Sequence, residues 1–443
     1  MIFRLRDFVF YPLAIRRFDK LLSESQYWSP AKRRSWVQEK LQRTLEHAVK
    51  HVPYYRRTLG PLASRFNDML DRLDLSELPF LTKEAIRNHY DELRADDCEK
   101  YKPIPVRTSG STGTPTQFLL DRQANVSHFA SIWRVLNWAG YRFGNRFADL
   151  TGHVFKNDRL FEYDMRLNCL YLSSFNFKKE NIPLYVERLN KFKPTLIKAY
   201  PSALDLFCRW VRETGLTPYR PKAVLTCAES LLDHQRATIE ETLQCPVFDF
   251  YNQNERAALI STCEKQVHHI HEEYSYVELV GSRDNGLLPS QSSEIVATTL
   301  HNSAMPLIRY RTDDIAGPAE ASRCSCGRTY RSLKRIVGRI EDVVITPDQR
   351  YVGRLDAAFK YSPGIRLSQI IQDSADEIVV NIVKANSYNS KDEETLLREL
   401  RARLGHEIKI TLRSVEAIPA GSNGKLKFVI SRPGREALQH LHG

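Results

Sequence analysis

The spacing of hydrophobic and polar residues predicts helices and strands that follow one another in alternation. After Ser29-Pro30, hydrophobic residues recur at the spacing of one helix face until Pro53 ends the run. From about residue 100 to 300, β-rich segments alternate with helical stretches at 202–213 and 232–243. This alternation predicts an α/β architecture with much parallel sheet. The candidate strands are TLIKAY (195–200), KAVLTC (222–227), VFDFY (247–251) and EIVATTL (294–300).

Beyond about residue 338 the pattern predicts a smaller unit. EIVVNIVKA (377–385) indicates a strand, and the alternation of Ile408, Ile410 and Leu412 indicates another. Between them we expect a helix that Ser390 caps and that ends just before Gly405. The helix carries hydrophobic residues at Leu396, Leu397, Leu400 and Leu404.

Together these patterns predict an α/β protein of two domains. A large N-terminal domain over residues 1–337 would contain several layers with mixed and parallel sheets, after an N-terminal helical segment. A small, mobile α+β domain over residues 338–443 would follow a hinge near the sequence IVGRIEDVV. Two domains that meet at a short charged hinge can build an active site that closes.

Basic residues are concentrated at the start of the chain. The formal net charge is +12, and residues 1–60 hold 13 Lys and Arg but 5 Asp and Glu. We interpret this segment as a solvated helical face, with an anionic membrane surface or another acidic partner as the alternative. No nucleic-acid-binding motif accompanies the charge, which argues against nucleic acid as a partner. Without a long apolar run or a secretory signal, we expect a cytoplasmic protein, or one peripheral to the inner membrane surface.

The most informative segment for chemistry is TSGSTGTPT (108–116), in which hydroxyls and glycines alternate. Hydroxyls and backbone N–H groups in a Gly-rich turn suit a phosphate chain, because they offer many donors and little bulk. No Lys-Ser/Thr pair follows Gly113, so this is not a Walker A loop. Taken alone, the segment is equally well explained as a polar surface loop.

Four further motifs follow this loop in order, and the set resembles the adenylate-forming superfamily of acyl-CoA synthetases, adenylation domains and luciferases. The closest similarity is to the phenylacetate–CoA ligase branch, including its capsule-biosynthesis relatives, and it covers nearly the whole chain. HVPYYR (51–56), MPLIRYR (305–311) and CSCGR (324–328) are similar to that branch. The four motifs are YNQNE (251–255), RYRTDD (309–314), GRIED (338–342) and NGK (423–425).

The resemblance implies a role for individual residues. Tyr251 would lie against the adenine of ATP, Glu255 would hold Mg²⁺, and Asp314 would accept hydrogen bonds from the ribose. Lys425 would be the catalytic lysine that neutralises charge as the carboxylate approaches the α-phosphate, with Arg339 beside the ribose or phosphates. The other residues that the resemblance assigns to nucleotide binding are Thr108, Ser109, Gly110, Ser111, Thr112, Gly113, Glu229, Asn252 and the hinge residue Glu341.

Three residues depart from the family motifs. Asn252, Asp313 and Glu341 stand where the family has Gly, Gly and Asp. Asparagine tolerates a left-handed backbone, so the change at Asn252 is expected to be mild. Asp313 adds a second negative charge beside Asp314, close to where a nucleotide would bind.

Cysteines and histidines predict a structural zinc site. Cys324 and Cys326 flank one serine, and Cys263 precedes three histidines at 268, 269 and 271. Thiolates and an imidazole can close a tetrahedral Cys3His site; the alternative is free thiols beside a surface histidine cluster. Relatives in the branch carry a similar pattern, and the resemblance selects His269 as the nitrogen ligand. The other cysteines are expected to be core residues: Cys98, Cys169, Cys208, Cys227 and Cys245.

The function that the resemblance implies is ATP-dependent activation of a small-molecule carboxylic acid as an acyl-AMP. Transfer of the acyl group to coenzyme A would follow, which makes the protein an acid–thiol ligase. One alternative is transfer to an amine or hydroxyl, for example in surface-polysaccharide or natural-product synthesis. A second alternative is a non-catalytic, zinc-containing binding protein that keeps the ligase fold.

Overall fold

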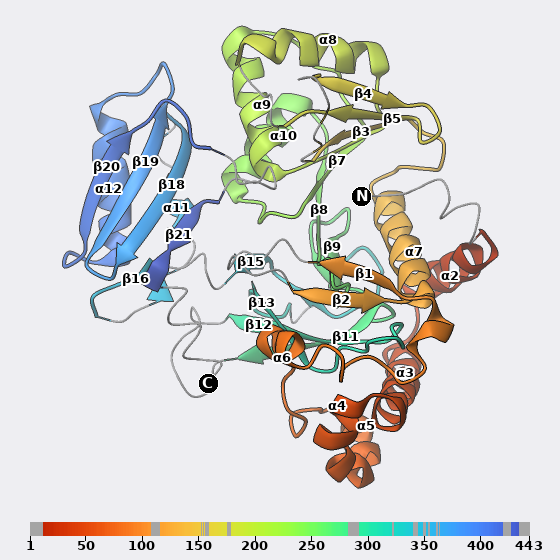
Figure 1. Cartoon of the computed structure of the whole chain (residues 1–443). Helices are drawn as coiled ribbons and strands as arrows, with labels where there is room; N and C mark the ends of the chain where they lie inside the picture. Colours follow the sequence, from red (N-terminus) through yellow and green to blue (C-terminus); the bar gives the residue numbers. More distant parts are fainter. Residues whose placement is uncertain are drawn as a thin grey trace. The chain divides into compact units, whose positions relative to one another are not determined.

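The computed structural model describes residues 12–107, 116–151, 153, 155, 159–174, 179–281, 292–320, 323–339, 344–348, 351–352, 355–359, 362, 364–419 and 427–433. The chain forms two compact units (Figure 1). The first comprises Met1–Arg142, Phe248–Val280 and Glu294–Arg335. The second comprises Phe143–Val247, Gly281–Ser293 and Ile336–Gly443. No helix among the described residues has the length and apolarity that a bilayer span requires.

Helix α3 illustrates how local sequence sets the elements of the first unit. Ser29 accepts a hydrogen bond from the Lys32 N–H at the start of this helix, and Pro30 occupies its first turn. Val37, Leu41, Leu45 and Ala48 form its buried face. The helices of this unit are α2 (Pro12–Ser25), α3 (Pro30–His51), α4 (Pro53–Thr58), α5 (Phe66–Arg72), α6 (Lys83–Asn88) and α7 (Arg122–Trp138), with 3-10 turns at Gly60–Arg65 and Cys98–Tyr101.

The strands of the first unit lie in three groups. One is the antiparallel pair β1 and β2, the second has the order β14-β10-β9-β8, and the third has the order β11-β12-β13. Strands β8 and β13 carry two of the predicted nucleotide motifs. The strands are β1 (Ile104–Arg107), β2 (Gln117–Leu120), β8 (Val247–Asn252), β9 (Leu259–Thr262), β10 (His268–Ile270), β11 (Ser275–Gly281), β12 (Ser293–Thr299), β13 (Tyr310–Ala316) and β14 (Ser332–Leu333).

Residues 143–247 of the second unit form the parallel sheet that the sequence predicts. The strand order is β7-β6-β3-β5-β4, and only β4 runs antiparallel to its neighbour. Helices α8, α9 and α10 pack their apolar residues against one face of the sheet. The elements are β3 (Phe147–Leu150), β4 (Phe161–Asp164), β5 (Cys169–Leu172), α8 (Ile182–Phe192), β6 (Leu196–Ala199), α9 (Pro201–Thr214), β7 (Ala223–Cys227) and α10 (Asp233–Leu243), with a 3-10 turn at Lys179–Asn181.

The C-terminal residues have a sheet and a core of their own. The sheet has the order β20-β19-β18-β21, and α12 contributes Leu396, Leu400 and Leu404 to the core beside it. The expected strand and helix segments are present. The elements are β15 (Ile336–Arg339), β16 (Val344–Ile345), β17 (Tyr351–Val352), α11 (Asp356–Phe359), β18 (Ile365–Ser374), β19 (Glu377–Lys384), α12 (Ser390–Leu404), β20 (Lys409–Ser414) and β21 (Val429–Ser431).

The predicted cap of α12 is wrong by one residue. Asn389, not Ser390, caps the helix, because the Asn389 side chain accepts from the Lys391 N–H. The Asp392 carboxylate accepts from the Asn389 N–H in return, which completes a capping box. Gly405 follows the helix with a φ of 90°, as its position in the sequence predicts.

Candidate nucleotide site and metal centre

Strands β8 and β13 bring Tyr251 and Asp314 into contact. The Tyr251 hydroxyl donates to Oδ2 of Asp314 at 2.6 Å. Asp314 is buried, and burial together with this carboxylate raises the pKa of Tyr251 well above its usual value. Tyr251 therefore stays a neutral donor, and its hydrogen bond brings the phenol ring next to the Asp314 carboxylate.

Glu255 lies just after β8 and faces the same strand β13. Glu255 is 5% exposed, and its carboxylate accepts a hydrogen bond from the Tyr310 hydroxyl at 2.9 Å. Burial raises the pKa of Glu255, while a backbone hydrogen bond and the nearby Lys83 ammonium act in the opposite direction. The Tyr310 bond uses one of the acceptor positions of this carboxylate. The remaining oxygen positions suit a hard cation such as Mg²⁺.

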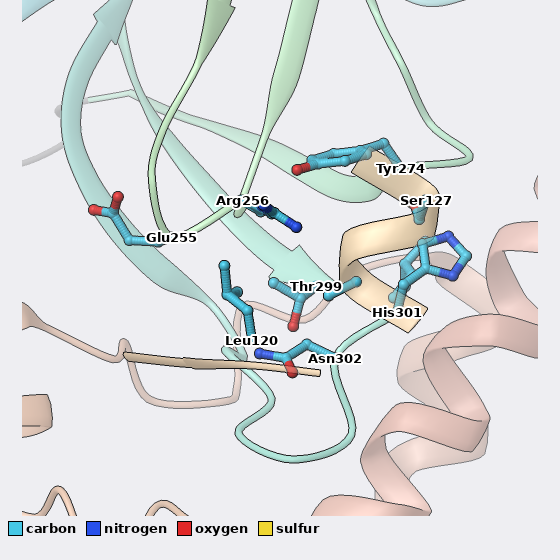
Figure 2. Close-up of a pocket in the computed structure, with 10 residues that line it drawn as sticks. Leu120, Ser127, Glu255, Arg256, Tyr274, Thr299, His301 and Asn302 are labelled. Carbon is cyan, nitrogen blue, oxygen red and sulfur yellow. The ribbon is translucent and has the colours of Figure 1, made fainter. Parts of the chain in front are cut away.

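A small pocket beside Glu255 is built from α7, β2 and the end of β12 (Figure 2). The Arg256 side chain points toward α7, where it donates to the Asn125 amide oxygen and lies over the Phe129 ring, whereas the Glu255 carboxylate points away from the other labelled residues. The polar groups of the pocket bond to the protein itself: the Asn302 amide donates to the Leu119 and Met305 carbonyls at 2.8 Å, and His301 Nε2 lies 2.6 Å from the Glu273 carbonyl. We therefore interpret the pocket as packing that holds the residues around Glu255 in place, not as a ligand-binding pocket.

The residues of the RYRTDD motif have two kinds of role: the two arginines bind other strands of the sheet, and the two aspartates lie next to Lys83 and Tyr251. Arg309 forms a double hydrogen bond with Glu278, and Arg311 does so with Glu294. These bonds connect Arg309, just before β13, to β11 and Arg311 of β13 to β12. Asp313 has a φ of 61°, in the left-handed region that favours glycine. The residue is thus an aspartate in a backbone conformation that glycine adopts more readily. Asn252, in contrast, is extended and pairs with Leu259.

The structure describes both flanks of the predicted phosphate loop. Arg107 at the end of β1 lies opposite Gln117 at the start of β2, so the loop connects two paired strands. Thr116, the last residue of the TSGSTGTPT segment, accepts a hydrogen bond from Arg87 at 3.2 Å. The predicted ligands Thr108, Ser109, Gly110, Ser111, Thr112 and Gly113 lie outside the described residues.

Four predicted residues belong to the second unit. Glu229, just after β7, accepts from the Ser202 N–H at 3.1 Å, and thus binds the first turn of α9. Arg339 is the last residue of β15, and its side chain is not among those described. Glu341 and Lys425 lie outside the described residues.

Cys263, His269, Cys324 and Cys326 come together in the first unit. Their ligand atoms all lie within 4.8 Å of one another; the Cys263 and Cys324 sulfurs are 3.6 Å apart, and the Cys326 sulfur is 3.4 Å from His269 Nε2. Ligands of a tetrahedral zinc ion are roughly 3.5 to 3.8 Å apart, given zinc–sulfur bonds of about 2.3 Å and zinc–nitrogen bonds of about 2.0 Å. The donor set and spacing therefore fit zinc.

Protonation of this cluster follows from its surroundings. Burial lowers the pKa of His269 to about 4, so its imidazole is neutral and able to bind a metal. Burial raises the pKa of the Cys263 thiol to about 12. For Cys326, burial is outweighed by donors that include the Arg328 N–H, 3.4 Å from its sulfur, and the pKa falls. Bound zinc would deprotonate these thiols.

The neighbouring histidines have other partners. His271 Nε2 lies 2.8 Å from the Ser261 hydroxyl and its Nδ1 lies 2.5 Å from Arg134, while His268 lies 3.5 Å from Asp249. These contacts leave His269 as the histidine of the cluster. The five cysteines that we expected in the core, Cys98, Cys169, Cys208, Cys227 and Cys245, are all buried.

Lys83 is the residue of this site that the sequence interpretation missed. It lies in α6 and forms an ion pair with Asp313 at 2.7 Å. The sequence offered one weak signal, a lysine in a short polar helix start, LTKE (81–84), which is common on protein surfaces. The contact joins residues 230 positions apart, so local sequence does not predict it.

Known proteins with similar sequences or folds identify the superfamily. The family described as CapK C-terminal domain matches residues 344–432. Protein CapK of Staphylococcus aureus is 25% identical over 81% of this chain and 80% of its own length. A phenylacetate–coenzyme A ligase of Thermus thermophilus is 26% identical over 90% of this chain and 96% of its own length. A crystal structure of a 2-hydroxyisobutyryl-CoA ligase in the postadenylation state superposes with a TM-score of 0.70 at 20% identity, covering 94% and 95% of the two chains.

The last match establishes the fold, and the sequence relatives agree with it. The chain is a member of the adenylate-forming superfamily, and its class of activity is that of an AMP-forming ligase. Within the superfamily it belongs to the phenylacetate–CoA ligase branch, together with CapK.

Proposed function

We propose that this chain activates a small carboxylic acid with ATP and then transfers the acyl group to coenzyme A. The observation that carries the proposal is a cluster of four side chains. Tyr251 and Glu255 of the YNQNE motif form hydrogen bonds with Asp314 and Tyr310 of the RYRTDD motif, so the two motifs meet at one site. The names of the relatives, phenylacetate–coenzyme A ligases, support a thiol as the acceptor.

The first half-reaction joins the acid to the nucleotide. A carboxylate oxygen attacks the α-phosphorus of ATP, a phosphorus–oxygen bond forms, and the bond to pyrophosphate breaks. Asp314 would hold the ribose through both hydroxyls, and Tyr251 would present its ring to adenine. Glu255 would hold Mg²⁺, and the bound ion would neutralise part of the negative charge of the phosphates. Lys425 would neutralise the charge that accumulates between the carboxylate and the α-phosphate.

The second half-reaction consumes the acyl-AMP. A thiolate attacks the acyl carbon, the carbon–sulfur bond forms, and AMP leaves with the electron pair of the broken carbon–oxygen bond. The acceptor must reach the carbon that Lys425 would cover during the first step. We therefore propose that the C-terminal residues rotate between the steps about Glu341, because a hinge needs only a few backbone angles to change.

The zinc ion that we propose for Cys263, His269, Cys324 and Cys326 has a structural role. Four protein ligands fill a tetrahedral site and leave no position for substrate. The cluster joins the β9–β10 connection to the segment before β14, so a metal there would tie together two parts of the chain 61 residues apart.

A pyrophosphate-exchange assay over a panel of acids tests the proposal. Aryl-acetic, hydroxy and fatty acids are each incubated with ATP, Mg²⁺ and labelled pyrophosphate, with Asp314→Ala as the inactive control. We expect exchange with at least one acid, followed by release of AMP when coenzyme A is added. Release with an amine or a sugar hydroxyl but not with coenzyme A would reassign the acceptor. A protein that binds no nucleotide would instead be a binding protein on the ligase fold.

A further inference from the structure

Asp313 stands where the motif that this chain resembles has glycine. With a φ of 61°, the residue is in the region that aspartate and asparagine enter more readily than other non-glycine residues. The Thr312 hydroxyl accepts from the Asp314 N–H at 3.1 Å and donates to the Ile295 carbonyl at 2.7 Å, so the turn is fixed on both sides. The Asp313 carboxylate is therefore held beside the ribose-binding Asp314.

Lys83 is placed against this carboxylate by the backbone of the chain. Leu81, two residues earlier, forms a parallel bridge with Tyr310: its N–H donates to the Arg309 carbonyl and its carbonyl accepts from the Arg311 N–H, each at 3.0 Å. Thr82 then caps α6 by accepting from the Ala85 N–H at 3.1 Å. The start of α6 is thus fixed to β13, and the Lys83 ammonium lies 2.7 Å from Oδ2 of Asp313.

This pair differs from an ordinary surface ion pair in its exposure and in its neighbours. The side chains of Lys83 and Asp313 are each 23% exposed, so solvent screens them only in part. Glu255 and Asp314 are buried close by, which makes three carboxylates in a site that must accept an anionic nucleotide. An uncompensated third carboxylate would repel the phosphates of the nucleotide.

We propose that Lys83 and Asp313 act as a charge-compensated pair beside Asp314, with Lys83 as the positioning residue that makes the aspartate compatible with nucleotide binding. The inference rests on the proposed function, because it needs a nucleotide at Asp314. It adds a requirement: with an aspartate at position 313, full nucleotide affinity depends on the cation at position 83.

A double-mutant cycle on nucleotide binding tests the pair. AMP and ATP affinities are measured by titration calorimetry without Mg²⁺, for the wild type, Lys83→Met, Asp313→Gly and the double variant. We expect Lys83→Met to weaken binding about tenfold in the wild-type background but by less than about threefold when Asp313 is glycine, because the two charges act on each other. Asp313→Gly alone should bind at least as well as the wild type, since glycine suits a positive φ.

Two further variants control for folding and for charge. Lys83→Arg keeps the cation and should restore most of the affinity. Lys100→Met removes the ammonium of another Lys–Asp pair, with Asp97, that is outside the nucleotide motifs, and should leave binding unchanged. Melting temperatures accompany every measurement, and Lys83→Gln replaces Lys83→Met if that variant does not fold.

The outcomes separate this inference from the proposed function. Equal losses for Lys83→Met in both backgrounds, or no loss in either, would overturn the pair while leaving the ligase assignment intact. If the wild type and Asp313→Gly both bind neither AMP nor ATP, the proposed function itself is wrong.

Discussion

The Tyr251 hydroxyl donates to the Asp314 carboxylate across 2.6 Å, although the two residues are 63 positions apart in the chain. We propose above that Tyr251 contacts the adenine and Asp314 the ribose. Here the hydrogen bond joins the two side chains, so the orientation of the carboxylate depends on the tyrosine. Gln253 also contacts the tyrosine hydroxyl, which further fixes the phenol ring.

This contact predicts different results for two changes at Tyr251. Tyr251→Phe keeps the ring but removes the donor, and should weaken AMP binding by about fivefold, the worth of one hydrogen bond of about 1 kcal/mol. Tyr251→Ala removes the ring as well and should weaken binding further. Titration calorimetry with AMP measures both. Equal affinities for the two variants would mean that the ring does not contact adenine.

Lys425 is expected to be required for adenylation and not for folding. Lys425→Ala should lower the rate of pyrophosphate exchange on the order of 100-fold, the usual effect of removing one group that stabilises developing charge. Its melting temperature should stay near that of the wild type. The control is Lys427→Ala, because Lys427 is exposed. If Lys427→Ala is the inactive variant instead, the catalytic lysine is misassigned by two residues.

The Cys3His cluster predicts about one equivalent of zinc in the purified protein. Cys324→Ser should lose the metal, and the melting temperature should fall with it, because the metal ties two segments together. Elemental analysis and thermal unfolding measure the two effects. Cys245→Ala is the matched control: this buried cysteine lies outside the cluster, so the variant should keep its zinc even where stability falls. Full stability of a metal-free wild type would refute the site.

The buried His301 predicts a loss of stability in mild acid. Burial lowers the pKa of His301 to about 4 from an ordinary value of 6.5. Between these values the unfolded chain binds a proton that the folded chain does not, so the free energy of unfolding falls as the pH drops, by about 1.4 kcal/mol per pH unit per proton at most. His301→Gln keeps a donor for the Glu273 carbonyl but cannot titrate. It should flatten the dependence of unfolding free energy on pH from about 6.5 to 4. An unchanged slope would mean that His301 does not contribute to it.

Much of the fold follows from the sequence because its signals are local. The apolar face of α3, the cap at Ser29 and the glycine after α12 each depend on residues a few positions apart. The cap of α12 was misplaced for the same reason: Asn389 and Ser390 are both good caps, and only the capping box with Asp392 decides between them. The domain boundary near residue 338 and the roles of Glu229, Arg339, Glu341 and Lys425 stay predictions.

The sequence by itself determined the class of elements, the order of the motifs and the donor types of the metal cluster, because these depend on residue identity and spacing. Tertiary structure decided which of the three histidines joins the cysteines, since that depends on the partners that Ser261 and Arg134 offer to His271. It also decided that Asp313 adopts a glycine-like backbone and pairs with Lys83. Lys83 and Asp313 are 230 positions apart, so they can pair only because α6 packs against β13. The local sequence around either residue does not predict that packing.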